Sequence, residues 1–254
     1  MSIGSESDLI AIKKVSEAVA NTLRLMRDYA KPGMSTLELD EYGGKLLAEY
    51  GAKSAPNVTY GFPGHTCISV NREVAHGIPS ESKILQNGDL VNIDVSAEID
   101  GFFSDNGGSF ILGEDINNLS KVVEASREIL FKAIHQIKGG VRVSDIGKLI
   151  ETEAKKRGLT VIKNLAGHGI GRSLHEEPHD ILCYADNSNK TRFRKNSIVA
   201  IETFISTKAT YAYENEDGWT METKDGSYVA QHEHTIMVTD GVPVILTEAN
   251  QIWN

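Results

Sequence analysis

The sequence predicts an α+β fold in which two similar halves, each made of helices followed by strands, form one domain over residues 1–254. Apolar residues recur at helical spacing early in each half, and β-prone runs follow them. Short motifs of the first half reappear in the same order in the second half, 99 to 108 residues further along the chain. No low-complexity segment or linker rich in proline and serine separates the halves. We therefore expect one domain with pseudo-twofold symmetry.

The repeat rests on three pairs of motifs. Residues 33–51 and 140–158 both begin and end with glycine, and each range encloses an amphipathic helix after a K-x-G stop. The motif "HGIP" at residue 76 corresponds to "HEEP" at residue 175, and "DLVNID" ending at residue 94 corresponds to "SIVAIE" ending at residue 202. Chance similarity between segments of the same type is the alternative to a duplication.

The helices of the first half have clear start and stop signals. Residues 6–30 carry apolar side chains at helical spacing and end at "KPG". Ser35 and Glu38 form a capping-box signature for a second helix, which we expect to continue to Gly51. After residue 57 the pattern changes to short β-prone runs. The run "VNIDVSAEIDGFFSDNG", residues 91–107, then predicts a hairpin.

The second half follows the same plan. A helix is predicted from about Ser120 to Gln136 and stops at "KGG", and another is predicted from about Ser144 to Gly158. From residue 159 onward the pattern is typical of strands.

Composition excludes several classes of protein. The net charge of −9 and the pI near 5.4 argue against nucleic acid or an anionic membrane as the main partner. No apolar run approaches the roughly 18 residues of a membrane span, and residues 1–14 lack the apolar core of a signal peptide. Cys67 and Cys183 are far apart and form no CxxC motif, so neither a zinc knuckle nor a disulfide framework is indicated. We expect a soluble protein of the reducing cytoplasm.

The hairpin places two aspartates where a cation would fit. Asp100 and Gly101 are a strong two-residue turn signal, and with that turn Asp105 lies opposite Ser96. Because side chains alternate along a strand, Asp94 then points to the same side as Asp105, on a diagonal of roughly 7–8 Å. A buried charge is costly unless it is paired or bound to a metal. A solvated edge hairpin with scattered acids is the alternative.

Other isolated polar residues extend this candidate metal site. His168 and His175 lie among glycines, although a lone histidine is more often a hydrogen-bonded core residue. Glu202 is the only charge in "SIVAIETFIS", and Glu233 lies in the strand-like run "YVAQHEHTIMV". Four carboxylates and one neutral histidine, His168, would offset two divalent ions and suit hard or borderline metals.

Several motifs together resemble the methionine aminopeptidases, in particular their bacterial short form. They are "TCISVNREVAHGIP", "NIDVS", "SDNG", "GHGIGRSLHEEP", "AIETFIS" and "AQHEHTIMVT", and the resemblance covers nearly the whole chain. It implies the pita-bread fold of prolidases and creatinase, a pseudo-twofold-symmetric antiparallel sheet core with helices on the outside. This agrees with the repeat found in the sequence.

The resemblance also implies a set of metal ligands. Asp94, Asp105, His168, Glu202 and Glu233 match the family's five ligands for two divalent metal ions, with Asp105 and Glu233 bridging both. Cobalt, manganese, iron and zinc all tolerate such a ligand set.

Further roles follow from the same resemblance. Glu202 would accept a proton from water, His76 would contact the scissile amide, and His175 would contact its carbonyl. Four residues fall where the family lines its methionine pocket: Phe62, Cys67, Leu174 and Trp219.

Three residues depart from the family pattern, each beside a ligand. They are Asn106, Thr203 and His232, where the family usually has threonine, proline and an apolar or aromatic residue. Groups around the ligands tune metal affinity, so we expect these residues to affect metal preference and rate.

The implied activity is metal-dependent removal of the initiator methionine, with preference for a small second residue. The partners would be N-terminal peptides of nascent proteins, met at the ribosome by a monomeric enzyme. Three alternatives remain at this stage: a proline-specific peptidase of the same fold, a catalytically silent relative that binds peptides, and a chain whose acids and histidines are scattered without function.

Overall fold

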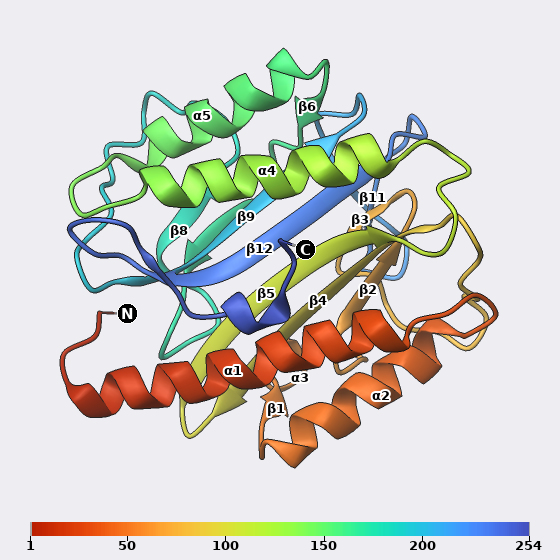
Figure 1. Cartoon of the computed structure of the whole chain (residues 1–254), viewed down its shortest axis with the longest axis horizontal. Coiled ribbons are helices and arrows are strands. Elements are labelled where there is room, and N and C mark those ends of the chain that lie inside the picture. The colour runs from red at the N-terminus through yellow and green to blue at the C-terminus, as the bar shows by residue number, and fades with distance from the viewer. Residues whose placement is uncertain (1, 254) are drawn as a thin grey trace.

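A computed structural model describes residues 2–253 and shows a large antiparallel sheet with helices packed across it (Figure 1). The first half contains these elements: α1 (Glu6–Tyr29), α2 (Thr36–Glu49), β1 (Lys53–Ser54), α3 (Ala55–Tyr60), β2 (Cys67–Val70), β3 (Glu73–Ala75), β4 (Leu90–Ile99) and β5 (Phe102–Ile111).

The second half begins with two helices again and continues with strands. Its elements are α4 (Ser120–Gln136), α5 (Val143–Lys156), β6 (Thr160–Val161), β7 (Ala166–Gly169), β8 (Glu176–Leu182), β9 (Ile198–Ser206), β10 (Tyr213–Glu214), β11 (Met221–Glu222), β12 (Val229–Met237), β13 (Val244–Ile245) and a 3₁₀ helix, η1 (Glu248–Asn250).

The main sheet joins the two halves at its centre. Its strands follow the order β1-β4-β5-β12-β9-β7-β8, with β2 beside β4, β6 beside β9 and β13 beside β12. Strands β10, β11 and β3 form a separate small sheet. Helix α1 packs on β4 and β5, whereas α4 packs on β9 and β12. Both halves therefore place a long helix over a pair of central antiparallel strands, as the predicted pseudo-twofold symmetry requires.

The predicted helices are confirmed with small shifts at their ends. The apolar residues that predict α1 are buried in it, among them Ile12, Val19 and Met26. The Ser35 hydroxyl accepts a hydrogen bond from the Glu38 amide and starts α2, which ends at Glu49 rather than at Gly51. Helix α3 was not predicted, because its six residues are too few to show a helical period.

The predicted register of the β4–β5 hairpin is confirmed. Ser96 pairs with Asp105 and Ile99 with Phe102, as a two-residue loop at Asp100 and Gly101 requires. Both loop residues have positive φ, 54° and 79°, which a tight hairpin turn of this kind needs.

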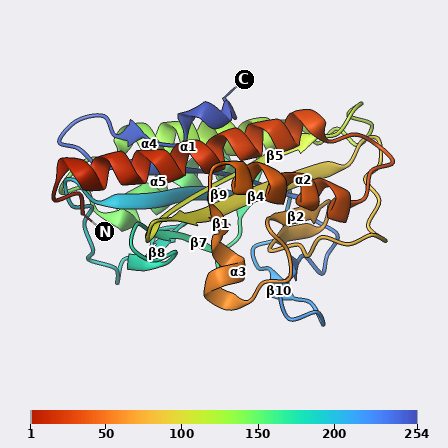
Figure 2. The ribbon, with the colours of Figure 1, turned by 90° about the horizontal axis from the view of Figure 1, so that it is seen from below.

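The two faces of the main sheet have different coverings. The view in Figure 2 shows α1 and α4 on one side of the sheet and α3 with β10 on the other. The apolar core lies mainly between the sheet and the long helices. Within residues 2–253, no helix has both the length and the apolar character needed to cross a membrane.

Candidate metal centre

A cavity of about 300 Å³ opens on the side of the sheet that carries α3. Its walls come from α3, from strands of both halves and from the loops before β8 and β11. All eleven residues that the sequence singles out line it: Phe62, Cys67, His76, Asp94, Asp105, His168, Leu174, His175, Glu202, Trp219 and Glu233. Residues far apart in the sequence thus meet where the two halves join.

Strand alternation explains why the carboxylates face the cavity. The Ser104 hydroxyl is 2.9 Å from that of Ser16 in α1, so Ser104 faces the helices and its neighbour Asp105 faces away from them. Asp105 pairs with Ser96, and Asp94 lies two residues before Ser96 on the same face of β4. The hairpin therefore presents both aspartates to the cavity, as its register predicts.

The second half supplies its carboxylates by the same principle. Glu202 in β9 and Glu233 in β12 are directly opposite each other in the antiparallel pairing. The Thr203 hydroxyl is 2.8 Å from that of Ser126 in α4, so the neighbouring Glu202 faces the cavity. Adjacent strands bring the two glutamates together without any irregularity in the register.

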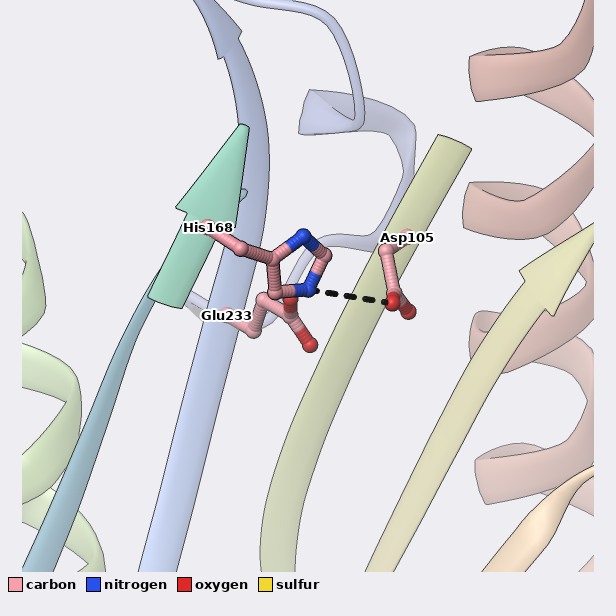
Figure 3. Close-up of side chains that lie close together, drawn as sticks. All are labelled: Asp105, His168 and Glu233. Carbon is pink, nitrogen blue, oxygen red and sulfur yellow. Dashed lines mark ion pairs between the residues drawn. The ribbon is translucent and has the colours of Figure 1, made fainter. Parts of the chain in front are cut away.

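His168 completes a compact group of possible ligand atoms. Figure 3 shows its ring facing Asp105 and lying beside Glu233, and ligand atoms of these three residues lie within 4.8 Å of one another. Its Nε2 is 3.9 Å from Oδ2 of Asp105. Its Nδ1 is 3.0 Å from the Gly169 carbonyl oxygen, which can only accept a hydrogen bond. The ring proton therefore resides on Nδ1, and the Nε2 lone pair is free to bind a cation.

The four carboxylates are electrostatically unstable without a positive partner. Burial, followed by repulsion from the neighbouring acids, raises the pKa of Asp94 and Glu233 well above their usual range. Burial also raises the pKa of Asp105 to about 6, and burial with repulsion from Asp105 raises the pKa of Glu202 to about 8. Among residues 2–253, no lysine or arginine lines the cavity to balance these charges.

The donor set fits divalent metal ions. The Oδ1 atom of Asp105 is buried and has no hydrogen-bond partner within the described chain, although a buried carboxylate oxygen normally has one. Burial lowers the pKa of His168 to about 3, so its imidazole is neutral and available as a ligand. Clustered carboxylate oxygens with one imidazole nitrogen are typical of Mn, Fe, Co and Zn sites.

Besides His168, three histidines line the cavity: His76, His175 and His179. His76 directly follows β3 with a positive φ of 55°, and His175 directly precedes β8. Nδ1 of His175 is 2.7 Å from the Tyr60 hydroxyl, and its ring centroid is 4.1 Å from that of His168. Burial lowers the pKa of both His76 and His175, and His76 lowers the pKa of His175 further, so both rings are neutral near pH 7.

An apolar slot adjoins the acidic group. The ring of Phe62 meets that of Trp219 edge-on, with centroids 5.2 Å apart and an interplanar angle of 84°. Cys67 and Leu174 are buried beside them in the same cavity. Cys67 pairs with Asp94 across β2 and β4, so the slot and the carboxylates are neighbours. The cavity thus has one charged end and one apolar wall.

Sequence reasoning missed residues that are hydrogen-bonded to the candidate ligands. The Gln231 side-chain amide donates to Glu233 at 3.1 Å and to Glu202 at 3.4 Å. Asn92 in turn donates to the Gln231 side-chain oxygen at 2.7 Å. Strand alternation was an available signal, because Gln231 and Glu233 are two residues apart on β12 and share a face. The sequence carries no comparable signal for Tyr60, which contacts His175.

The three residues that depart from the family pattern face away from the cavity. Nδ1 of His232 is 3.0 Å from the Ser126 hydroxyl, which also meets Thr203, so β9, β12 and α4 share one polar contact. The Asn106 side chain donates to the Val95 carbonyl oxygen and accepts from Asn250. These side chains support the strands from the helix side of the sheet.

Comparison with known proteins gives consistent matches. The model of metallopeptidase family M24 matches residues 10–240. A relative named methionine aminopeptidase 2, from Bacillus subtilis (strain 168), is 50% identical over 98% of this chain and 100% of its own length.

Solved structures match over the same extent. The crystal structure of methionine aminopeptidase from Thermotoga maritima superposes with a TM-score of 0.92 at 36% identity, covering 97% of this chain and 99% of that one. Prolidase from Pyrococcus furiosus has a TM-score of 0.76 at 20% identity, covering 96% of this chain and 65% of that one, which shows a shared fold.

Proposed function

Because the chain belongs to metallopeptidase family M24 and, within it, to the methionine aminopeptidases, we propose that it removes the initiator methionine from nascent proteins with a small second residue. The observation that carries this proposal is the cavity itself. Four carboxylates, three of them buried, and a neutral imidazole adjoin an aromatic slot of the kind that a methionine side chain would fill. The fold is the pita-bread fold that methionine aminopeptidases and prolidases share.

Five residues would hold two divalent ions: Asp94, Asp105, His168, Glu202 and Glu233. Asp105 and Glu233 are proposed as the shared ligands, and their place within the compact group around His168 supports this. When bound, the ions would supply positive charge that lowers the pKa of a water molecule and polarises the peptide carbonyl. The donor set accepts cobalt, manganese, iron or zinc.

The protein side chains supply the proton transfers and the orientation. Glu202 would accept the proton of the attacking water, since its buried carboxylate faces the cavity beside the other proposed ligands. His175 would donate a hydrogen bond to the carbonyl oxygen as negative charge develops there. His76 would bond the amide of the bond being cut. Neutral rings suit both histidines, because each can donate from one nitrogen without carrying a charge.

The slot accounts for the choice of first residue. A thioether beside aromatic rings gains roughly 0.3–1.5 kcal/mol from sulfur–aromatic contact. Phe62 and Trp219 offer such faces, and Cys67 and Leu174 offer apolar walls. A charged first residue would be left unpaired in this slot, at a cost that the slot cannot offset. The second residue would pass close to His76 and the ligands, which favours small side chains.

The proposal also covers the substrates, the cellular compartment and the oligomeric state. The substrates would be N-terminal peptides of nascent proteins, met as the chain leaves the ribosome in the cytoplasm. The free, buried state of Cys67 and Cys183 suits a reducing compartment. We also propose that the chain acts as a monomer with a single catalytic domain, since the main sheet runs through both halves and the cavity draws residues from each.

Peptide selectivity tests the proposal. We expect kcat/KM for Met-Ala-Ser to exceed that for Met-Leu-Ser and for Ala-Pro by at least roughly 100-fold. We expect a norleucine peptide to be cleaved almost as well as the methionine peptide, because a swap of one methylene for sulfur is worth only ~1–3 kcal/mol. Preference for Ala-Pro would instead indicate a proline-specific peptidase, and no hydrolysis of any peptide in the presence of Mn²⁺ or Co²⁺ would indicate a silent peptide-binding relative.

A further inference from the structure

The Tyr60 hydroxyl is hydrogen-bonded to one of the two ring nitrogens of His175. Its hydroxyl oxygen is 2.7 Å from Nδ1 of His175, and its ring lies against the histidine ring with centroids 5.7 Å apart. Both residues line the cavity. Within residues 2–253, no protein group is hydrogen-bonded to the other ring nitrogen, Nε2. That nitrogen is therefore the one left to meet a substrate.

The position of Tyr60 is set by the elements around it. Tyr60 is the last residue of α3, which the Ser54 hydroxyl caps by accepting from the Asn57 amide. The Asn57 side chain donates to the Phe62 carbonyl oxygen at 2.9 Å, so the helix also anchors the residue that forms the slot. Ser54 pairs with Ala97 in β4, the strand that carries Asp94. Helix α3, and with it Tyr60, is therefore anchored next to β4, the strand that carries the proposed ligand Asp94.

The chemistry of the pair decides which partner donates. A phenol is a better hydrogen-bond donor than a neutral imidazole, and an imidazole nitrogen is a better acceptor than a phenol oxygen. Burial raises the pKa of Tyr60, which keeps its hydroxyl protonated. The distance of 2.7 Å is also typical of an O–H donor, since N–H donors have a mode near 2.9–3.0 Å. The Tyr60 hydroxyl therefore donates to Nδ1.

We propose that Tyr60 is a positioning residue, which holds the His175 ring in place with its proton on Nε2, so that an N–H bond is available to the substrate carbonyl. This inference rests on the proposed function, in which His175 stabilises the developing negative charge on that oxygen. In the opposite tautomer, Nε2 would present a lone pair to a carbonyl oxygen, and the two would repel. Tyr60 itself need not touch the substrate.

Kinetics of Tyr60→Phe provide the first test, with Tyr211→Phe as the matched control. Both tyrosines are 51% exposed, but Tyr211 lies outside the cavity. We expect Tyr60→Phe to lower kcat on Met-Ala-Ser roughly 10-fold, as is typical for loss of a group that orients a catalytic side chain. KM and metal content should stay within about twofold of the parent values, and Tyr211→Phe should match the parent. In a His175→Ala background, Tyr60→Phe should cause no further loss.

An equal loss of kcat with and without His175 would overturn the inference, because Tyr60 would then act independently of that ring. Unchanged kcat in Tyr60→Phe would overturn it as well.

Nitrogen NMR of ¹⁵N-histidine-labelled, zinc-loaded protein gives a second test that does not depend on activity. His175→Ala assigns the signals. We expect Nε2 to be protonated and Nδ1 to be a hydrogen-bonded acceptor in the parent, and Nδ1 to lose its hydrogen bond in Tyr60→Phe. Protonated Nδ1 in the parent, or an unchanged His175 spectrum in Tyr60→Phe, would refute the inference. Failure of the proposed function would appear separately, as absence of methionine release by the parent protein.

Discussion

Three of the four histidines that line the cavity differ in what surrounds their rings. His168 donates from Nδ1 to a backbone carbonyl oxygen, which leaves Nε2 facing Asp105 at 3.9 Å. His175 accepts from Tyr60, and His76 stands at a positive φ directly after β3. The proposed function assigns His168 as a ligand and His76 and His175 as residues that meet the substrate, and the contacts of His168 and His175 support this division.

This division predicts different effects of alanine substitution. His168→Ala should lower metal affinity by roughly 10- to 100-fold, because it removes an imidazole aimed at the carboxylates. His76→Ala and His175→Ala should keep the metal content of the parent while kcat falls roughly 100-fold, the size expected for a proton-transfer or hydrogen-bonding group. Metal analysis beside steady-state kinetics checks both statements. Equal metal loss in all three variants would show that the division is wrong.

At the scale of single elements, the β4–β5 hairpin was predictable because its information is local. Asp100 and Gly101 specify a two-residue turn, and the turn then sets which side chains share a face. The two glutamates followed from isolated charges in otherwise apolar strands. Placement of these residues in one cavity is borne out by the structure, whereas their individual catalytic roles stay predictions.

Other features could not be read from the sequence because they depend on distant contacts. Helix α3 is too short to show a period, and the bond between Tyr60 and His175 joins residues 115 positions apart. The burial of Gln231 against Glu202 and Glu233 depends on how β9 and β12 pair. Local signals thus predicted the strands that carry the proposed ligands, and tertiary packing determined which side chains support those residues.

At the scale of the whole molecule, the cavity exists only where the two halves meet. Asp94 and Asp105 come from the first half, while His168, Glu202 and Glu233 come from the second. The ligand group therefore brings like charges together across the junction of β5 and β12. Without bound cations, this arrangement opposes folding at any pH at which the acids are ionised.

The stability of the metal-free protein depends on pH because burial shifts the pKa values of the acids and histidines. Asp105 and Glu202 have pKa values of about 6 and about 8 in the folded state, raised from ordinary values of 3.8 and 4.5. Between the unfolded and folded values the native state binds more protons, so stability falls as pH rises. Buried His168, His232 and His234 have a pKa lowered to about 3 and act in the opposite direction, but only up to about pH 6.5.

We therefore expect the Tm of chelator-treated protein to fall as pH rises from about 6.5 to about 8. Added Mn²⁺ should raise Tm more at pH 8 than at pH 6.5, because the ionised acids bind it more strongly. Glu202→Gln, which removes one of the titrating carboxyls, should weaken the fall. Calorimetry at the two pH values checks this, and a flat or rising Tm for the metal-free parent would count against the charge cluster.

The dependence of methionine release on metal tests the central claim most directly. The parent protein is stripped with a chelator, dialysed, and assayed on Met-Ala-Ser while Mn²⁺ or Co²⁺ is added back. We expect no release of methionine from the stripped protein, full recovery on addition of metal, and no recovery by Asp105→Ala, which removes a proposed shared ligand. Full activity of the stripped protein with no detectable metal would contradict the account.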